Sequence, residues 1–223
     1  MPLSASEISI LSAGANLEGE LRIPSAPKGV VVFAHGSGSG RRSPRNRLIA
    51  DCLHRAGFAT LLFDLLTFEE DRDYETRFDI ALLTERLVGA VDWLQTRHES
   101  ESLLVGLFGA STGAAAALRA AAKLEGTVQA VVSRGGRPDL AMKEVPQVLA
   151  PTLFIVGERD QDVLDLNRKA QAALPDDTLS RLEIVPGATH LFEEPGALEH
   201  VAELATDWFS LHSAHFADVW DGG

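Results

Sequence analysis

Short apolar runs alternate with helix-like patterns along almost the whole chain, and this alternation strongly limits the folds open to it. The first clear run, Gly29–His35, is almost continuously apolar, as a strand buried on both faces requires. Between the runs, apolar residues recur at the spacing of amphipathic helices. Further strands are expected at Phe58–Phe63, Leu103–Phe108, Val128–Val132, Thr152–Val156 and Arg181–Val185. The pattern predicts an α/β fold with a doubly wound, mostly parallel sheet and helices on both faces.

The remaining segments complete this organisation. Before the first run, Glu7–Leu11 and Leu17–Ile23 alternate apolar and polar residues, which predicts an edge hairpin over about residues 7–23. Helices are expected at 44–56, 80–94, 112–124, 139–149, 163–174 and 198–208, followed by a tail over about residues 212–223. The 223 residues contain no internal repeat or low-complexity tract, so we interpret residues 1–223 as a single domain.

Composition excludes several classes of partner. The chain has 20 Lys and Arg against 32 Asp and Glu, a net charge of −12, which argues against binding nucleic acid or an anionic membrane surface. The single cysteine excludes a disulfide framework within the chain. The amino terminus lacks a signal-peptide pattern, and no apolar run approaches the ~20 residues of a membrane helix. We therefore expect a soluble, cytoplasmic protein.

One strand-to-helix junction carries a nucleophile motif. Gly109-Ala-Ser-Thr-Gly113 matches the pattern G-x-S-x-G between a buried strand and an alanine-rich helix. A sharp turn there would strain the backbone of Ser111 and raise its hydroxyl above the carboxyl edge of the sheet. The glycines are expected where side chains would clash. The alternative is an ordinary tight turn with a capping serine.

A serine hydroxyl becomes an effective nucleophile beside a base that a carboxylate orients. Asp160 and His190 each follow one of the buried runs, in loops at the carboxyl edge, where catalytic groups of open α/β sheets collect. Glu158 and Asp162 are alternatives to Asp160. His35 is the rival base, but it directly precedes a glycine loop and is expected to shape that loop.

Acyl transfer also needs N–H donors for the oxyanion of its tetrahedral intermediate. The backbone N–H of Thr112, at the start of a helix, is one candidate, and that of Ser37, in the glycine loop 36–40, is the second. This loop lacks the lysine ending of a P-loop and the glycine spacing of a dinucleotide site. Histidines and acids show no compact metal-ligand spacing. We therefore expect no cofactor and no metal.

Four motifs together resemble the α/β-hydrolases, specifically the dienelactone hydrolase-like branch of small enzymes without a lid. They are His35-Gly-Ser-Gly, Gly109-Ala-Ser-Thr-Gly113, Gly157-Glu-Arg-Asp160 and Gly187-Ala-Thr-His190, and the similarity spans roughly residues 17–209. The resemblance implies the α/β-hydrolase fold, a sheet of about eight strands, and a triad of Ser111, Asp160 and His190. Dienelactone hydrolases proper carry cysteine as the nucleophile, so the serine favours an esterase, lactonase or thioesterase.

The sequence says less about the size and charge of the substrate. Only about 19 residues separate the strand after the Ser111 helix from the next strand, too few for a separate cap domain, so we expect an open pocket for a small soluble substrate. Arg41, Arg42 and Arg134 lie beside the predicted site and are candidate contacts for an anionic substrate. The alternative is a solvated surface whose charges pair with nearby acids. The acidic segment Leu65–Arg77 is either a partial lid or an exposed connector.

The sequence thus predicts a serine hydrolase that cleaves a small carboxylic ester, lactone or thioester through an acyl-enzyme on Ser111. An acyltransferase or perhydrolase would use the same triad, and a non-catalytic member of the fold would bind a small molecule without turnover. The oligomeric state is not determined by the sequence.

Overall fold

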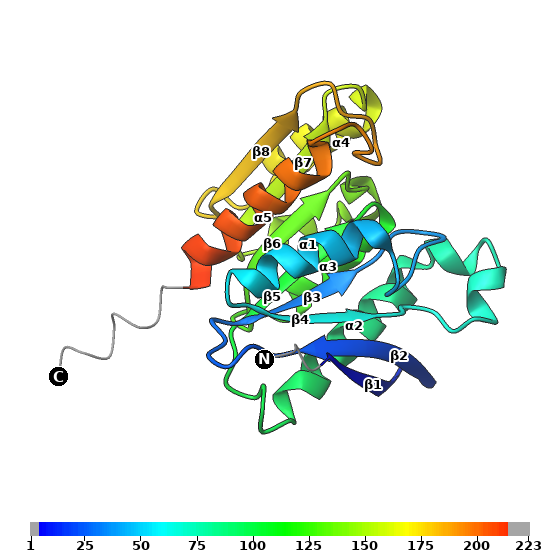
Figure 1. Ribbon diagram of the computed structural model, residues 1–223. Helices are drawn as coiled ribbons and strands as arrows, with labels where there is room; N and C mark the ends of the chain where they lie inside the picture. Colours follow the sequence, from blue (N-terminus) through cyan, green and yellow to red (C-terminus); the bar gives the residue numbers. More distant parts are fainter. Residues whose placement is uncertain (1–4, 214–223) are drawn as a thin grey trace.

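An eight-stranded sheet runs through the middle of the fold (Figure 1). The computed structural model describes residues 5–213. The strand order is β1-β2-β4-β3-β5-β6-β7-β8, with β3 to β8 parallel and β1 and β2 antiparallel. The strands are β1 (Ala5–Ser12), β2 (Ala15–Arg22), β3 (Val30–Ala34), β4 (Ala59–Phe63), β5 (Val105–Ala110), β6 (Val128–Arg134), β7 (Thr152–Gly157) and β8 (Ser180–Val185). The predicted sheet is confirmed.

The edge hairpin is also confirmed. β1 and β2 pair along their whole length, and β2 then pairs with β4, so β1 forms the free edge of the sheet. The two residues between them, Ala13 and Gly14, have φ values of 44° and 74°. Left-handed backbone at both central residues is typical of the turn whose twist matches a two-residue hairpin.

Helices cover both faces of the sheet, as the alternation predicted (Figure 1). On one face, α1 and α5 pack through Ile49, Leu53 and Val201 against Val31 and other inward residues of the strands. On the other face lie α2, α3 and α4. The helices are α1 (Pro44–Arg55), α2 (Ile80–Gln95), α3 (Thr112–Lys123), α4 (Gln161–Ala173) and α5 (Ala197–Ser213). Because strand residues alternate between the two faces, each continuously apolar strand packs against helices on both faces of the sheet.

The helix expected at residues 139–149 is wrong. This segment forms two short 3-10 turns, η3 (Pro138–Ala141) and η4 (Val145–Gln147). Pro146 lacks the N–H that a continuous α-helix would donate to the carbonyl of Met142, so the helix cannot run through this position undisturbed. At the other end of the chain, residues 212 and 213 belong to α5 and not to a tail. The rest of the expected tail, residues 214–223, lies outside the described residues.

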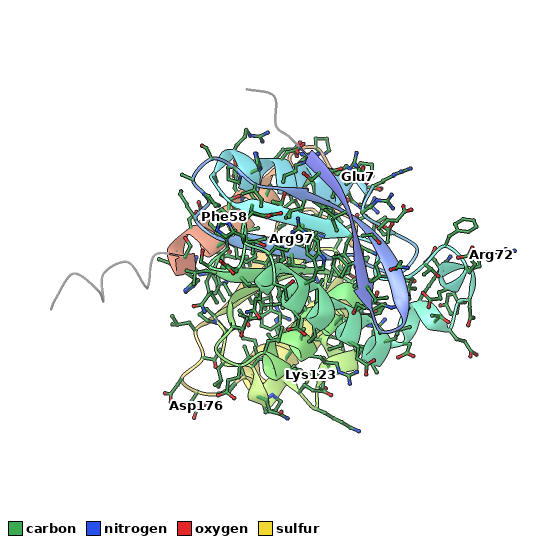
Figure 2. The ribbon with its side chains drawn as sticks, turned by 90° about the horizontal axis from the view of Figure 1, so that it is seen from below. Glu7, Phe58, Arg72, Arg97, Lys123 and Asp176 are labelled. Carbon is green, nitrogen blue, oxygen red and sulfur yellow. The ribbon has the colours of Figure 1, made fainter. Side chains whose placement is uncertain are left out.

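The acidic segment between β4 and α2 projects from the body of the sheet, with Arg72 on its outer part (Figures 1 and 2). It contains the 3-10 turns η1 (Glu70–Arg72) and η2 (Thr76–Phe78). Its base is held by Arg86 of α2, whose side chain is 1% exposed. Two guanidinium nitrogens donate to the Glu70 carboxylate at 2.6 Å each, and Nη1 also donates to the Leu65 carbonyl at 2.8 Å. We call residues 65–78 the anchored segment.

Candidate active site

A strained turn between β5 and α3 presents Ser111. Its φ of 51° and ψ of −119° lie in a region that residues with a side chain rarely adopt. A Cβ on Gly109 would lie 2.4 Å from Ala114 Cα, and one on Gly113 would lie 2.1 Å from the Ala34 carbonyl oxygen. Both glycines are therefore required for the turn to pack against its neighbours, as the motif predicted.

Backbone hydrogen bonds hold this turn to the next strand. The N–H of Ser111 donates to the Arg134 carbonyl at 3.1 Å, and the Ser111 carbonyl accepts from Arg137 N–H and Ala114 N–H, each at 3.1 Å. These bonds satisfy the main chain of a residue in an unfavourable conformation. The Ser111 side chain makes no capping hydrogen bond to α3, which argues against the alternative of a capping serine.

Asp160 and His190 lie together. Asp160 is the residue before α4, and His190 is in the loop after β8. The Nδ1 atom of His190 is 2.6 Å from Asp160 Oδ2, and the Asp160 side chain is 16% exposed. Glu158 instead accepts a hydrogen bond from Gly187 N–H at 2.7 Å, and Asp162 is in the first turn of α4. Of the three candidate acids, Asp160 is the one that contacts His190.

One short segment adjoins both Ser111 and the histidine. Arg134 ends β6 and Gly135 follows it, and the Arg134 carbonyl accepts the Ser111 N–H. A Cβ on Gly135 would lie 3.4 Å from both Nδ1 and Cε1 of His190, so the imidazole packs directly on this glycine. With φ of 51°, Gly135 also needs the left-handed backbone that glycine tolerates. The sequence analysis did not identify this contact, although the glycine pair 135–136 after a buried strand was a visible signal.

The predicted oxyanion donors adjoin the nucleophile. A Cβ on Gly36 would lie 3.1 Å from Ser111 Cβ, which places the glycine loop against the turn. The N–H of Ser37 donates to Thr112 Oγ1 at 2.9 Å, and Thr112 is buried. The second predicted donor is therefore already partnered by a side chain that the sequence analysis did not consider.

His35 shapes the glycine loop. Its Nε2 accepts a hydrogen bond from Leu65 N–H at 2.9 Å, so Nδ1 carries the proton and donates to the Gly36 carbonyl at 3.0 Å. Burial of the imidazole lowers its pKa and favours this neutral form. The structure thus assigns both ring nitrogens to backbone contacts, which leaves neither free to act as a base.

The predicted arginines are in different surroundings. Arg41 and Arg42 lie in the wall of a cleft of about 760 Å³ between the glycine loop and the anchored segment. Arg41 is paired with Asp64 and Glu18, whereas Arg42 is exposed. Arg134 is 7% exposed and lies at the end of β6. The cleft is lined by His35 and by residues 16–18, 38–45, 64, 66–69 and 71.

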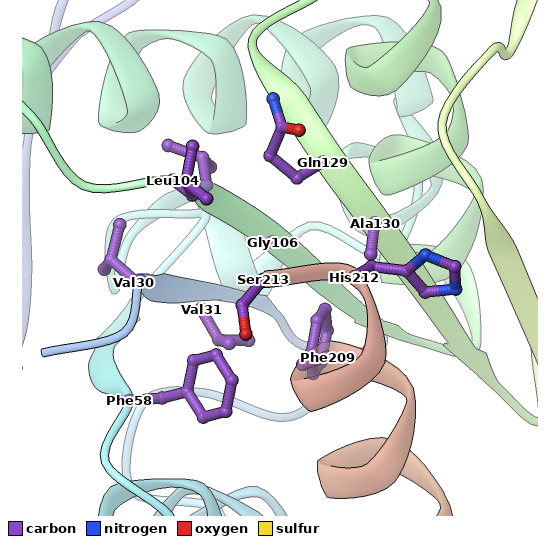
Figure 3. A pocket seen from close by; sticks show the side chains of 12 residues that line it. Val30, Val31, Phe58, Leu104, Gly106, Gln129, Ala130, Phe209, His212 and Ser213 are labelled. Atoms are coloured by element: carbon purple, nitrogen blue, oxygen red, sulfur yellow. The ribbon is translucent and has the colours of Figure 1, made fainter. Parts of the chain in front are cut away.

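A much smaller pocket of about 10 Å³ lies near the opposite edge of the sheet (Figure 3). Val30 and Val31 at the start of β3, Phe58 before β4, and Phe209 of α5 line it. In open α/β sheets, ligands bind at the carboxyl ends of the strands, which is the edge that carries Ser111 and His190. We therefore assign the candidate active site to the carboxyl edge.

Comparisons with known proteins identify the family and the fold. The model of the dienelactone hydrolase family matches residues 17–220. The crystal structure of a dienelactone hydrolase from Anabaena variabilis is 54% identical in sequence, covers 95% of this chain and 99% of its own, and superposes with a TM-score of 0.91. The esterase Est1E from Butyrivibrio proteoclasticus, at 17% identity, 94% and 99% coverage and a TM-score of 0.77, shows the fold alone.

A curated relative from Mycobacterium tuberculosis H37Rv carries a different name, "Putative phosphoribosyl transferase". It is 57% identical over 211 residues, which are 95% of this chain and 47% of that protein. The chain thus spans about half the length of this relative.

Over residues 5–213, no helix has the length and apolar character needed to cross a bilayer, and no cluster of three or more potential ligands could hold a metal ion.

Proposed function

Because the chain belongs to the dienelactone hydrolase family of ester-acting enzymes, we propose that it is a serine hydrolase using Ser111, His190 and Asp160. Its substrate class is a small carboxylic ester, lactone or thioester. The contact between His190 Nδ1 and Asp160 Oδ2 carries the proposal, because it orients a base beside the segment that also holds Ser111. Substrate enters an open site, since no cap domain is inserted between β6 and β7.

The carboxylate determines how the histidine works. An ionised carboxylate only accepts hydrogen bonds, so His190 carries its proton on Nδ1 and presents the lone pair of Nε2. That nitrogen takes the Ser111 hydroxyl proton as Oγ attacks the carbonyl carbon, and it returns the proton to the leaving group. Water then repeats the sequence on the acyl-enzyme and releases the acid. Asp160 stabilises the imidazolium that forms in each half-reaction.

The oxyanion would be held by the N–H groups of Thr112 and Ser37. The first is at the amino terminus of α3, where the helix dipole favours negative charge. The second now donates to the Thr112 hydroxyl, so this hydroxyl has to turn away or share the donor when the oxyanion forms. We infer that, before the oxyanion forms, this donor is satisfied by the side chain of Thr112.

The name of the M. tuberculosis relative does not change this proposal. The matched segment is about half of that protein, and the family model matching residues 17–220 is that of dienelactone hydrolases. We therefore propose hydrolase activity for this segment and no phosphoribosyl transfer.

Labelling of the nucleophile tests the proposal. A fluorophosphonate probe reacts with serines activated by a neighbouring base, so we expect labelling of the wild type and none of Ser111→Ala. Ser39→Ala, in the neighbouring glycine loop, is the matched control and should label normally. Persistent labelling of Ser111→Ala would overturn the nucleophile assignment, and an unlabelled wild type that turns over no p-nitrophenyl ester would overturn the hydrolase.

A further inference from the structure

Within residues 5–213, the buried guanidinium of Arg134 has no carboxylate partner. The residue is 7% exposed, and its Nε and Nη1 atoms are buried and make no hydrogen bond. The only guanidinium nitrogen left to reach solvent is Nη2. Two other little-exposed arginines differ: Arg86 is paired with Glu70, and Arg41 with Asp64 and Glu18. A buried cation without a counter-charge is strongly unfavourable, so Arg134 needs a separate explanation.

The groups around Arg134 do not supply a counter-charge. Its guanidinium carbon is 5.9 Å from the centre of the Phe192 ring, and its charged neighbour is a second cation, Arg45. Burial, together with the positive charge of Arg45, lowers the pKa of Arg134 to about 10. Arg134 therefore remains positively charged at neutral pH, and the two guanidinium groups repel each other.

Arg45 adds to the positive character of this region. It lies in the first turn of α1, which contains no acidic residue and where the helix dipole is positive. Its Nε is also buried without a hydrogen-bond partner, and its Nη1 is 3.1 Å from Glu193 Oε1, an exposed carboxylate. Glu193 therefore pairs with Arg45 and leaves Arg134 without a carboxylate partner among the described residues.

Both arginines belong to the edge that carries the candidate triad. The Arg134 carbonyl accepts the Ser111 N–H, and the next residue, Gly135, packs on the His190 ring. Arg45 lines the cleft of about 760 Å³ beside the glycine loop. A substrate whose anionic group lies near Arg45 in that cleft would extend along the glycine loop, which packs on Ser111, to reach the nucleophile.

We propose that Arg134 and Arg45 together bind a phosphate group carried by the substrate, an inference that rests on the hydrolase function proposed above. Among the described residues, the two neighbouring guanidinium groups have one carboxylate partner, Glu193 beside Arg45, so positive charge is left for an anion to neutralise. A phosphate monoester, which is close to a dianion at neutral pH, would supply that charge. Its oxygens can accept hydrogen bonds from two separate arginines, which bind phosphate in preference to many other groups. The substrate is then a phosphorylated alcohol or acid bearing a small ester.

Inorganic phosphate is the direct probe of this site. Titration calorimetry at constant ionic strength should detect phosphate binding to the wild type, and Arg134→Met or Arg45→Met should weaken it at least about tenfold. Arg55→Met is the matched control, because it removes the same charge from the exposed far end of α1. Acetate at equal ionic strength should bind more weakly than phosphate. No phosphate binding, an equal loss in Arg55→Met, or acetate binding as tight as phosphate would overturn the proposal.

Thermal unfolding separates a binding role from a packing role. Without phosphate, Arg134→Met should unfold at a higher temperature than the wild type, because an apolar side chain replaces an unpaired buried cation. Phosphate should then raise the melting temperature of the wild type and not that of the variant. A lower melting temperature, or a variant that does not fold, would show that Arg134 stabilises the fold and would refute the proposal. Arg134→Lys, which keeps the charge but lacks the planar guanidinium, should bind phosphate more weakly while folding normally.

Turnover then connects the site to the reaction. The ratio of kcat/KM for the acetyl ester of glycerol 3-phosphate to that for the acetyl ester of glycerol should fall at least about tenfold in Arg134→Met, and it should be unchanged in Arg55→Met. Phosphate binding needs no turnover, so a failed hydrolase proposal and a failed phosphate site give different results. An unchanged ratio in Arg134→Met would remove the arginine from substrate recognition.

Discussion

Replacing Glu70 with glutamine should destabilise the protein measurably, because this carboxylate neutralises a buried cation. Hydrogen bonds from Arg86 lower the pKa of Glu70 from its ordinary value of 4.5 to about 2. A drop of that size corresponds to about 3.4 kcal/mol of stabilisation of the charged form. The Glu70 side chain is 33% exposed, and solvent screening reduces the figure to about 2 kcal/mol. For a chain of this length, Glu70→Gln should lower the melting temperature by about 4–8 °C.

The stabilisation that Glu70 contributes should decrease as the pH falls. A carboxyl whose pKa is depressed by folding contributes its full stability above the unfolded-state pKa, and it loses that contribution as pH falls towards the folded-state value. The difference between wild type and Glu70→Gln should therefore be largest near pH 7. It should fall to about 1.2 kcal/mol at pH 3.5, between the two pKa values of Glu70, because the carboxyl is then largely protonated in the unfolded state.

Urea unfolding followed by circular dichroism measures both quantities, because urea is uncharged and does not screen the ion pair. Glu99→Gln is the matched control: Glu99 also pairs with an arginine, Arg97, but both side chains are largely solvated. It should leave the free energy of unfolding unchanged. If Glu70→Gln matched this control at pH 7, or if its effect were the same at pH 3.5, the pairing of Glu70 with Arg86 would not stabilise the fold.

Three further substitutions test other parts of the structure. Asp160→Asn should lower kcat for a p-nitrophenyl ester by about 10³–10⁴, while Asp162→Asn leaves it unchanged; equal effects in steady-state assays would contradict the assignment of the acid. Gly113→Ala should cost more than about 4 kcal/mol or prevent soluble expression, because its Cβ would lie 2.1 Å from the Ala34 carbonyl oxygen, and normal urea unfolding would disprove this contact. Arg41→Met should cost about 1 kcal/mol in the same assay by unpairing two carboxylates, and an unchanged midpoint would show that these ion pairs contribute nothing.

The fold could be predicted because its evidence is local. The parallel strands β3 to β7 are buried on both faces and so read as continuous apolar runs, and the helix spacing between the runs fixes the crossover connections. The same argument placed Asp160 and His190 at one edge, where the structure finds them 2.6 Å apart. The helix expected over residues 139–149 failed at Pro146, a position whose effect on the backbone was visible in the sequence.

The charged contacts could not be predicted in the same way. Arg86 lies on a helix and Glu70 in an acidic segment, and nothing in their spacing distinguishes this ion pair from the other combinations available. Arg41, Arg42 and Arg134 are the same residue type in the sequence. Among the described residues, Arg41 is paired with a carboxylate, Arg42 is exposed, and Arg134 is buried with no anion beside it. Whether an arginine is paired, exposed or buried alone depends on tertiary packing, because the free energy of a charge is determined by its burial and its neighbours.

Two unfavourable features of the fold occur on neighbouring strands. Ser111 has left-handed backbone directly after β5, and Arg134, at the end of β6, is a buried cation with no anion beside it. Ala110 and Arg134 are partners across these strands, and the Arg134 carbonyl accepts the Ser111 N–H. Each feature lowers stability on its own, so a fold retains it where something other than stability depends on it. Because the two features are joined by a hydrogen bond, a change that moves either one would displace the other, and we infer that they serve one site.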